Sequence, residues 1–524
     1  MKASLILIVM LAFLPLVSGC SPALQTSPAP LSSATLDPLQ ATSQPIAPLS
    51  SPTPTLETPV VVPTFQLSSA CVLTPAQRSR LETVSRKFLA STDEQALQVA
   101  RDLDYIGING QPATMCGPLS VAILQDAGLV DPYYDRANFY LLNPRPGFGD
   151  AYVESLFPSS RYLKIVEERV IKEVDYQTDP LCPGDFLYLF AGESGSYEHM
   201  LVVTRVDEFG RAYTVTNIDF REGYRVEELM LYDPAQPGVG MFTDWTSSPH
   251  PQIGRTGYDG FWLWRLKAPI ADPSPAAVEL AAAIDSIIEQ TGGIWHVQFK
   301  EVGGDVLYSR LADTRIHPAS VIKLADAVLF LNLLENTDVS DLPVYLRDHG
   351  TSSRSFEQLL RAMVVNSEES ATTSIENWIS GHSNPNIMIQ ELGFENTFII
   401  PRQSTTAELA GMIEQLYLGS LLGEESTAYL LGLLAEYTPS DVARTGVIRT
   451  MLGEGDLMYN KRGSLADFRV IVADLALVRF NGKAYTLAFF AYPDVENNGK
   501  PTYESLEKGV EQIAGTIMDF LKDQ

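Results

Sequence analysis

Ser320 and Lys323 are the two residues whose types and spacing most directly indicate chemistry. Pro318 suits the first turn of a helix, and residues three apart on a helix share a face. The Ser320 hydroxyl and the Lys323 amine are therefore expected to point into one pocket. A serine hydroxyl is a weak nucleophile without a base, and a lysine becomes a base when burial and a helix N-terminus lower its pKa. The spacing predicts attack by Ser320 with Lys323 as proton acceptor.

The elements expected around this pair form one mixed sheet and a helical lobe. Apolar periodicity predicts an opening helix, two strands, a mostly helical middle, two further strands and a last helix. Their expected ranges are 276–290, 295–299, 306–309, 321–450, 468–478, 485–492 and 505 onward.

Two polar motifs follow the Ser320 turn. Ser367-Glu368-Glu369 begins 47 residues after Ser320, and Lys461-Arg462-Gly463-Ser464 precedes the last strands. Together with Ser-x-x-Lys and the order of elements, they resemble class A serine β-lactamases and penicillin-binding proteins over nearly all of 276–524.

This resemblance implies a role for each motif. Ser367 would relay a proton to the leaving nitrogen, and Lys461 would hold a substrate carboxylate. The backbone N–H groups of Ser320 and Ser464 would form an oxyanion hole, with Arg462 and Gly463 beside the substrate.

The motifs also depart from the family pattern. Glu369 stands where the family has an asparagine, and an ionised carboxylate accepts hydrogen bonds but donates none. It could also pair with Lys323. Arg462 replaces a smaller threonine, and only Glu391 and Glu395 are near enough in sequence to supply a deacylating carboxylate. We therefore expect acylation of Ser320 by penicillin-like compounds with slow turnover.

A second candidate nucleophile lies in residues 70–268. Cys116 begins a predicted helix, a position that lowers a thiol pKa. His199 begins a predicted strand, and Asn217 and Asp219 end the next one. This order is similar to that of papain-like peptidases related to bacteriocin-leader processing enzymes. The resemblance implies that Cys116 is the nucleophile and His199 the base, with Asn217 or Asp219 orienting the imidazole and Gln111 as oxyanion donor. The alternative is a buried structural cysteine and a strand-end histidine.

The N-terminus predicts export. Lys2 and an apolar run over residues 5–16 precede Val-Ser-Gly-Cys20, which resembles the lipobox of bacterial lipoproteins, with Cys20 as the lipidated residue. The alternative is an ordinary secretory signal. Residues 21–69 are rich in Pro, Ser and Thr and predict a disordered spacer. If Cys20 is lipidated and Cys116 is reactive, Cys71 and Cys182 are available for a disulfide.

The whole chain of 524 residues is too long for one core. The predicted plan is a signal (1–20), a spacer (21–69), a papain-like α+β domain (70–268), a linker (269–275) and a β-lactamase-like α+β domain (276–524). The net charge of −27 argues against a nucleic-acid partner.

Three functions remain open at this point. The first is a serine hydrolase acting on a β-lactam or a cell-wall-type acyl substrate, without cofactor or metal, at the extracytoplasmic membrane surface. The second is a cysteine peptidase or amidase acting through Cys116. The third is a non-catalytic protein that binds cell-wall peptide.

Overall fold

The computed structural model describes residues 67–103, 115–136, 139, 150–191, 199–220, 223–246, 258–337, 339, 341–351, 353–436, 443–466, 470–494 and 501–524. The predicted signal, Cys20, most of the spacer and Gln111 lie outside these residues. Within them, no helix is both long and apolar enough to cross a membrane. The same residues contain no cluster of His, Cys, Asp and Glu that could hold a metal ion.

The N-terminal segment (residues 70–268) contains a six-stranded antiparallel sheet in the order β1-β6-β2-β3-β4-β5. Three of its strands match predicted ones, and three were not predicted. The strands are β1 (Tyr162–Glu167), β2 (Phe186–Ala191), β3 (His199–Val206), β4 (Ala212–Phe220), β5 (Gly223–Tyr232) and β6 (Tyr258–Leu266). The helices are α1 (Pro75–Ser85), α2 (Asp93–Asp102), α3 (Cys116–Asp126), α4 (Asp150–Leu156) and α5 (Met241–Thr246), with short 3₁₀ turns η1 (Arg86–Phe88) and η4 (Ile171–Glu173).

Both faces of this sheet are covered by apolar residues. Successive side chains of a strand point to opposite faces, and each face packs into its own apolar cluster. Met200 and Val202 of β3 pack with α1, α3 and α4 on one face. Leu201 and Val203 of the same strand pack with α5 and η4 on the other.

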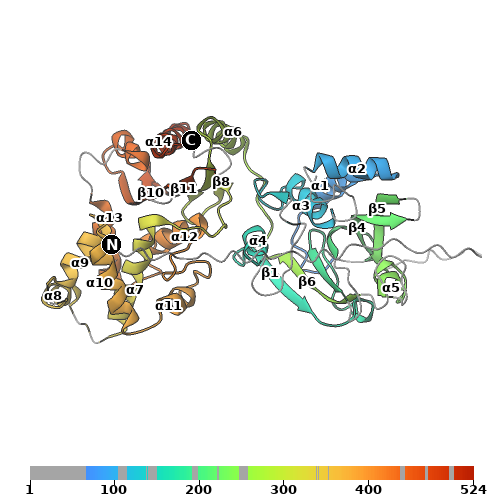
Figure 1. Cartoon of the computed structure of the whole chain (residues 1–524), viewed down its shortest axis with the longest axis horizontal. Coiled ribbons are helices and arrows are strands. Elements are labelled where there is room, and N and C mark those ends of the chain that lie inside the picture. The colour runs from blue at the N-terminus through green and yellow to red at the C-terminus, as the bar shows by residue number, and fades with distance from the viewer. Residues whose placement is uncertain are drawn as a thin grey trace, which may run out of the picture. The chain divides into compact units, whose positions relative to one another are not determined.

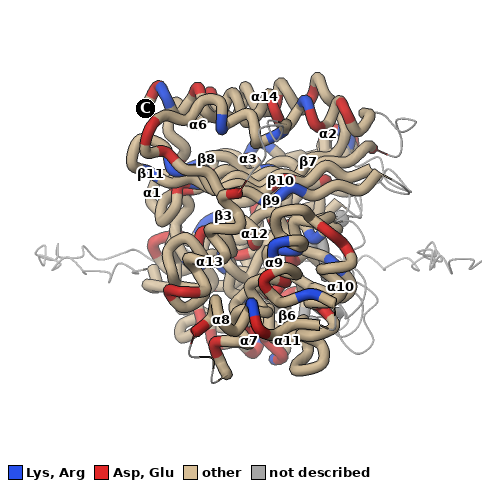
Figure 2. The backbone as a smooth tube through the Cα atoms, turned by 90° about the vertical axis from the view of Figure 1, so that its left-hand side faces the viewer, with Lys and Arg blue, Asp and Glu red and all other residues tan. Residues whose placement is uncertain are grey.

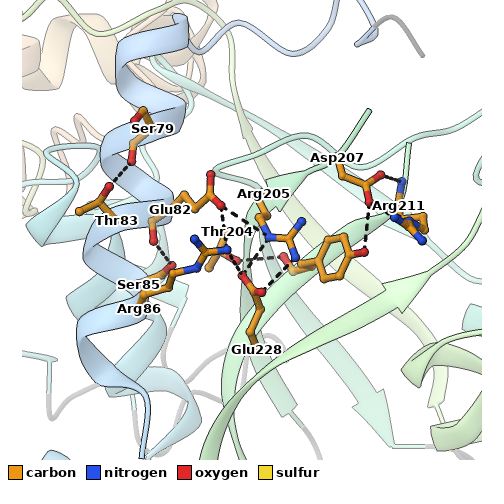
Figure 3. A network of polar contacts seen from close by, with 11 residues as sticks. Ser79, Glu82, Thr83, Ser85, Arg86, Thr204, Arg205, Asp207, Arg211 and Glu228 are labelled. Atoms are coloured by element: carbon orange, nitrogen blue, oxygen red, sulfur yellow. Dashed lines mark hydrogen bonds and ion pairs between the residues drawn. The ribbon is translucent and has the colours of Figure 1, made fainter. Parts of the chain in front are cut away.

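Polar contacts and a disulfide tie α1 to the sheet. Arg205 on β3 donates two hydrogen bonds to Glu228 on β5, at 2.9 and 3.0 Å, and Arg86 reaches Glu228 and Glu82 of α1 (Figure 3). Cys71, just before α1, forms a disulfide with Cys182, just before β2. The pairing that the cysteine count left open is therefore present.

The C-terminal segment (residues 276–524) contains a five-stranded antiparallel sheet in the order β8-β7-β11-β10-β9. Its strands are β7 (Ile294–Glu301), β8 (Val306–Arg310), β9 (Leu457–Leu465), β10 (Ile471–Phe480) and β11 (Lys483–Tyr492). Its helices are α6 (Pro275–Thr291), α7 (Lys323–Glu335), α8 (Leu342–Asp348), α9 (Phe356–Val364), α10 (Glu369–Ser380), α11 (Pro385–Glu391), α12 (Thr406–Tyr417), α13 (Glu424–Ala435) and α14 (Tyr503–Lys522), with 3₁₀ turns η5 (Ala319–Ile322) and η6 (Arg444–Met451).

This segment has three layers, with the sheet between two sets of helices (Figure 1). Val472 and Ala476 of β10 pack toward α6 and α14. Ala473 and Leu475 pack toward α7, α12 and the remaining helices, which form the lobe. Figure 2 shows basic and acidic residues interspersed along this lobe. The predicted sheet and helical lobe are confirmed. Four of the five strands match predicted ranges, and β9 was not predicted as a separate strand.

Candidate active site

Ser320 lies in the 3₁₀ turn η5, and Lys323 is the first residue of α7. A 3₁₀ helix has three residues per turn, so side chains at i and i+3 lie directly above one another. The turn begins with Ala319 at φ +50°, a left-handed conformation that is uncommon for a residue with a Cβ. The helix that was predicted to begin near Pro318 therefore opens with a 3₁₀ turn, and the α-helix itself begins at Lys323. The 3₁₀ geometry keeps Ser320 and Lys323 on the same side.

Ser367 is the residue that joins the two lysines. The Lys323 amine donates to the Ser367 carbonyl oxygen at 2.7 Å and lies 3.5 Å from its hydroxyl oxygen. The Lys461 amine donates to the same hydroxyl oxygen at 2.9 Å. Ser367 itself has φ +57°, in the loop between α9 and α10. Such backbone conformations cost about 1–3 kcal/mol and persist where the surrounding structure fixes them. The turn directs both oxygen atoms of Ser367 toward the amines.

Gly463 brings strand β9 against the Ser320 turn. A Cβ at residue 463 would lie 2.7 Å from the Ser320 backbone nitrogen and 2.9 Å from that of Val321. Because β9 is the last strand of its sheet, every second residue turns its N–H and C=O away from β10. Amides of the strand edge and of the Ser320 turn are thus neighbours, as an oxyanion hole requires.

The side chains of β9 divide between the two faces of the sheet. Lys461 and Gly463 face the helical lobe, opposite Leu475 and Ala473 of β10. Arg462 lies opposite Asp474 on the other face. Arg462 was expected beside the substrate, but strand alternation carries its side chain away from Ser320.

Ser464 shares that second face. Its hydroxyl accepts a hydrogen bond from Arg444 at 2.7 Å. Ser464 can therefore serve the site through its backbone only.

Glu369 forms an ion pair with Lys323, with 2.9 Å between the carboxylate oxygen and the amine. Its other oxygen lies 2.5 Å from Arg402, which also contacts Glu376 at 2.8 Å. Partial burial acts to raise the pKa of Glu369, but the hydrogen bonds from Lys323 and Arg402 outweigh it and lower that pKa. The predicted pairing of Glu369 with Lys323 is present, and Glu369 is an anion at neutral pH.

Neither glutamate proposed for deacylation contributes to the cluster of Lys323, Glu369 and Arg402. Glu391 and Glu395 are both exposed. The segment between α11 and α12 instead contributes the Arg402 guanidinium.

Two buried residues near the site were not predicted. Asp326, one turn after Lys323 on α7, is fully buried, and neither of its carboxylate oxygens has a hydrogen-bond partner among the described residues. Burial, with repulsion from Glu376, raises its pKa well above the usual value. Arg444 donates to the carbonyl oxygens of Gly463 and Ala473, at 2.8 and 3.0 Å, and so supports β9 from behind. In the sequence, Asp326 and Arg444 appear only as charged residues with apolar neighbours.

Cys116 and His199 have different packing neighbours. Cys116 packs with Met200 and Val202, on one face of β3. His199 alternates with those residues and lies against Trp245 on the opposite face, with its Nε2 atom 2.9 Å from the Thr216 hydroxyl.

Burial shifts the pKa of each group in the direction of its neutral form. Burial raises the pKa of the Cys116 thiol, opposite to the lowering expected from its helix N-terminus alone. Burial also lowers the pKa of His199 to about 4. Asn217 is buried in β4, and the side chain of Asp219 lies outside the described residues.

Residues 279–521 match the model of the beta-lactamase enzyme family. This range contains all of the residues gathered around Ser367. The C-terminal segment thus has a β-lactamase-like fold, a sheet with helices on both faces. No curated protein matches the chain.

Many solved structures are similar to this segment. A β-lactamase from Burkholderia vietnamiensis is 20% identical, with 46% of this chain and 96% of that one covered and a TM-score of 0.38. A β-lactamase from Xanthomonas campestris is 17% identical, with coverages of 47% and 98% and a TM-score of 0.40. The acyl-enzyme complex of a PBP-A mutant with penicillin G is 18% identical, with coverages of 48% and 100% and a TM-score of 0.38.

Proposed function

We propose that the C-terminal segment is a serine hydrolase of the β-lactamase type, in which Ser320 forms an acyl-enzyme with a β-lactam or a peptide-like acyl substrate. The observation that carries this proposal is the shared contact of Lys323 and Lys461 with Ser367. Lys323 follows Ser320 by one 3₁₀ turn. A nucleophile, two amines and a relay hydroxyl are the groups that acyl transfer to serine needs.

The second half of the cycle is proposed to be slow. Deacylation needs a carboxylate or another base that is free to activate water. Glu369 is the carboxylate nearest to Lys323 described above, and it already pairs with Lys323 and Arg402. A persistent acyl-enzyme would make the protein a penicillin-binding protein in behaviour.

Intact-mass spectrometry after treatment with penicillin G tests this proposal. We expect wild type to gain the mass of one penicillin, because ring opening loses no atoms, and Ser320→Ala to gain none. Ser374→Ala is the matched control, since that hydroxyl donates to the Ser370 carbonyl of its own helix and its loss should leave the adduct unchanged. An unmodified wild type, or an adduct retained by Ser320→Ala, would refute acylation at this site.

The proposal includes export and a lipid anchor at Cys20, supported by the apolar run and the lipobox-like residues before it. A lipid at this position, followed by the Pro-rich spacer, would hold both segments at the extracytoplasmic membrane surface. Cys20→Ser should move the protein from the membrane fraction to the soluble fraction. Equal membrane retention of both forms would contradict the anchor.

Cysteine peptidase activity is the weaker candidate for the N-terminal segment. The papain-like interpretation relied on the order Cys116, His199 and Asn217, whereas Cys116 packs with Met200 and Val202 and the His199 ring lies against Trp245. If that segment were the source of activity, Cys116→Ala would abolish hydrolysis of peptide substrates while Ser320→Ala would not.

A further inference from the structure

The two lysines around Ser367 have different kinds of partners. Lys323 contacts an anion and a carbonyl, since its amine lies 2.9 Å from Glu369 and 2.7 Å from the Ser367 carbonyl oxygen. Among the described residues, Lys461 donates to two neutral oxygens, the Ser367 hydroxyl and the Arg462 carbonyl, each at 2.9 Å. A neighbouring carboxylate favours the charged form of an amine, whereas neutral acceptors give much less compensation.

The surroundings of Lys461 disfavour its charge. Burial is the largest cause, with repulsion from Lys323 on α7 next, and together with the smaller effects they lower the pKa of Lys461 to about 7. Arg462 on its own strand and Arg444 on η6 act in the same direction. Asp474 on β10 opposes them, but burial raises the pKa of Asp474 to about 6, so it is not fully ionised in mildly acidic solution.

We propose that the proton of Ser320 passes through the Ser367 hydroxyl to Lys461, and that Lys323, held by Glu369, remains charged and acts on the substrate electrostatically. This proposal rests on acyl transfer at Ser320, as proposed above. It reverses the roles that the motifs alone predicted, in which Lys323 accepts the proton and Lys461 supplies the charge.

Each step of this route balances. The Ser320 hydroxyl gives its proton to the Ser367 oxygen while the Ser367 proton moves to the Lys461 nitrogen. The Ser320 oxygen forms a bond to the acyl carbon, and the carbonyl electron pair moves to its oxygen, facing the amides beside Gly463. The pair returns as the carbon–nitrogen bond breaks, and the leaving nitrogen takes the proton back from Lys461 through Ser367. The products are an acylated Ser320 and a free amine, with both lysines restored.

Lysine NMR tests the charge states without relying on activity. Protein labelled with ¹³C-lysine gives Cε signals that shift on deprotonation, and Lys461→Arg and Lys461→Met assign the signal of residue 461. We expect the Lys461 signal to titrate near pH 7, while the Lys323 signal keeps its charged-form shift over the same range. A Lys461 signal that keeps its charged-form shift to pH 9, or a Lys323 signal that titrates first, would overturn the proposal.

Acylation rates test the route itself. The wild-type rate should rise with pH through about 7, and Lys461→Arg should lower it by about 100-fold or more and abolish that rise, because a guanidinium keeps the charge but accepts no proton. Lys323→Arg keeps the charge and should retain the rise. Lys483→Arg, on an exposed lysine paired with Glu301, is the control for the exchange itself.

The outcomes separate the two proposals. An adduct whose rate keeps its pH dependence in Lys461→Arg would overturn the proton route but not acylation at Ser320. Absence of an adduct on wild type at any pH would overturn the proposed function, and this route with it.

Discussion

Gly463→Ala isolates the close approach of strand β9 to the Ser320 turn. The added Cβ would lie 2.7 Å from the Ser320 nitrogen and 2.9 Å from the Val321 nitrogen, and ordinary contact begins at 3.4 Å. Since both neighbours are backbone atoms, strand and turn must separate by about 0.7 Å, the difference between 3.4 and 2.7. Gly463 does not have a positive φ, so the exchange adds no backbone strain of its own.

A shift of this size affects stability and rate differently. Inserting a methyl group into a close-packed site costs about 1–3 kcal/mol of unfolding free energy. Displacing an oxyanion donor or a nucleophile by nearly 1 Å costs up to about 100-fold in rate. We therefore expect a folded variant that acylates Ser320 about 10–100-fold more slowly, well beyond its loss of stability.

Stopped-flow acylation with fluorescent penicillin, alongside thermal unfolding, measures both quantities. Gly432→Ala is the matched control, because that glycine lies inside α13 with open space around its Cβ position. The control should keep the wild-type rate and gain about 0.5–1 kcal/mol from reduced backbone entropy. A Gly463→Ala protein that acylates at the wild-type rate would refute the placement of the oxyanion site beside residue 463.

Two further predictions concern stability. Because burial raises the pKa of Asp474 to about 6 in the folded protein from 3.8, the folded state holds its proton more tightly, so this residue lowers stability as the pH rises from about 4 to 6. Asp474→Asn should therefore unfold like wild type near pH 4 but be more stable by about 3 kcal/mol at pH 8. Equal urea midpoints at pH 8 would contradict this. Replacing Cys71 and Cys182 together by serine opens a link across 111 residues and should lower stability by about 2–4 kcal/mol, and an unchanged thermal midpoint would show that the N-terminal segment does not depend on the bond.

The parts of the site that follow from local rules could be predicted from the sequence. A spacing of three on a helical turn predicted that Ser320 and Lys323 share one side of that turn. The alternating and apolar runs gave most strands of the C-terminal sheet. Each of these features depends on residues close together in the chain.

Features that depend on tertiary approach could not be predicted. Arg402 reaches Glu369 across 33 residues, and no local pattern links the two. The face of the sheet toward which the His199 side chain points could not be predicted either, because β3 is buried on both sides. Its run of apolar residues lacks the polar alternation that would tell which side chains meet Cys116.

Glu369, which stands where the resembled family has an asparagine, forms an ion pair with Arg402. Arg402 lies between Glu369 and Glu376, which are seven residues apart on α10 and so share one helix face. A neutral residue at position 369 would leave Lys323 and Arg402 without the carboxylate that they share, and two neighbouring cations would repel one another. The departure from the family pattern at residue 369 thus balances a cation supplied by the segment between α11 and α12. Glu369 also lies 2.9 Å from the Lys323 amine, which is why the proton acceptor is proposed on the opposite side of Ser367.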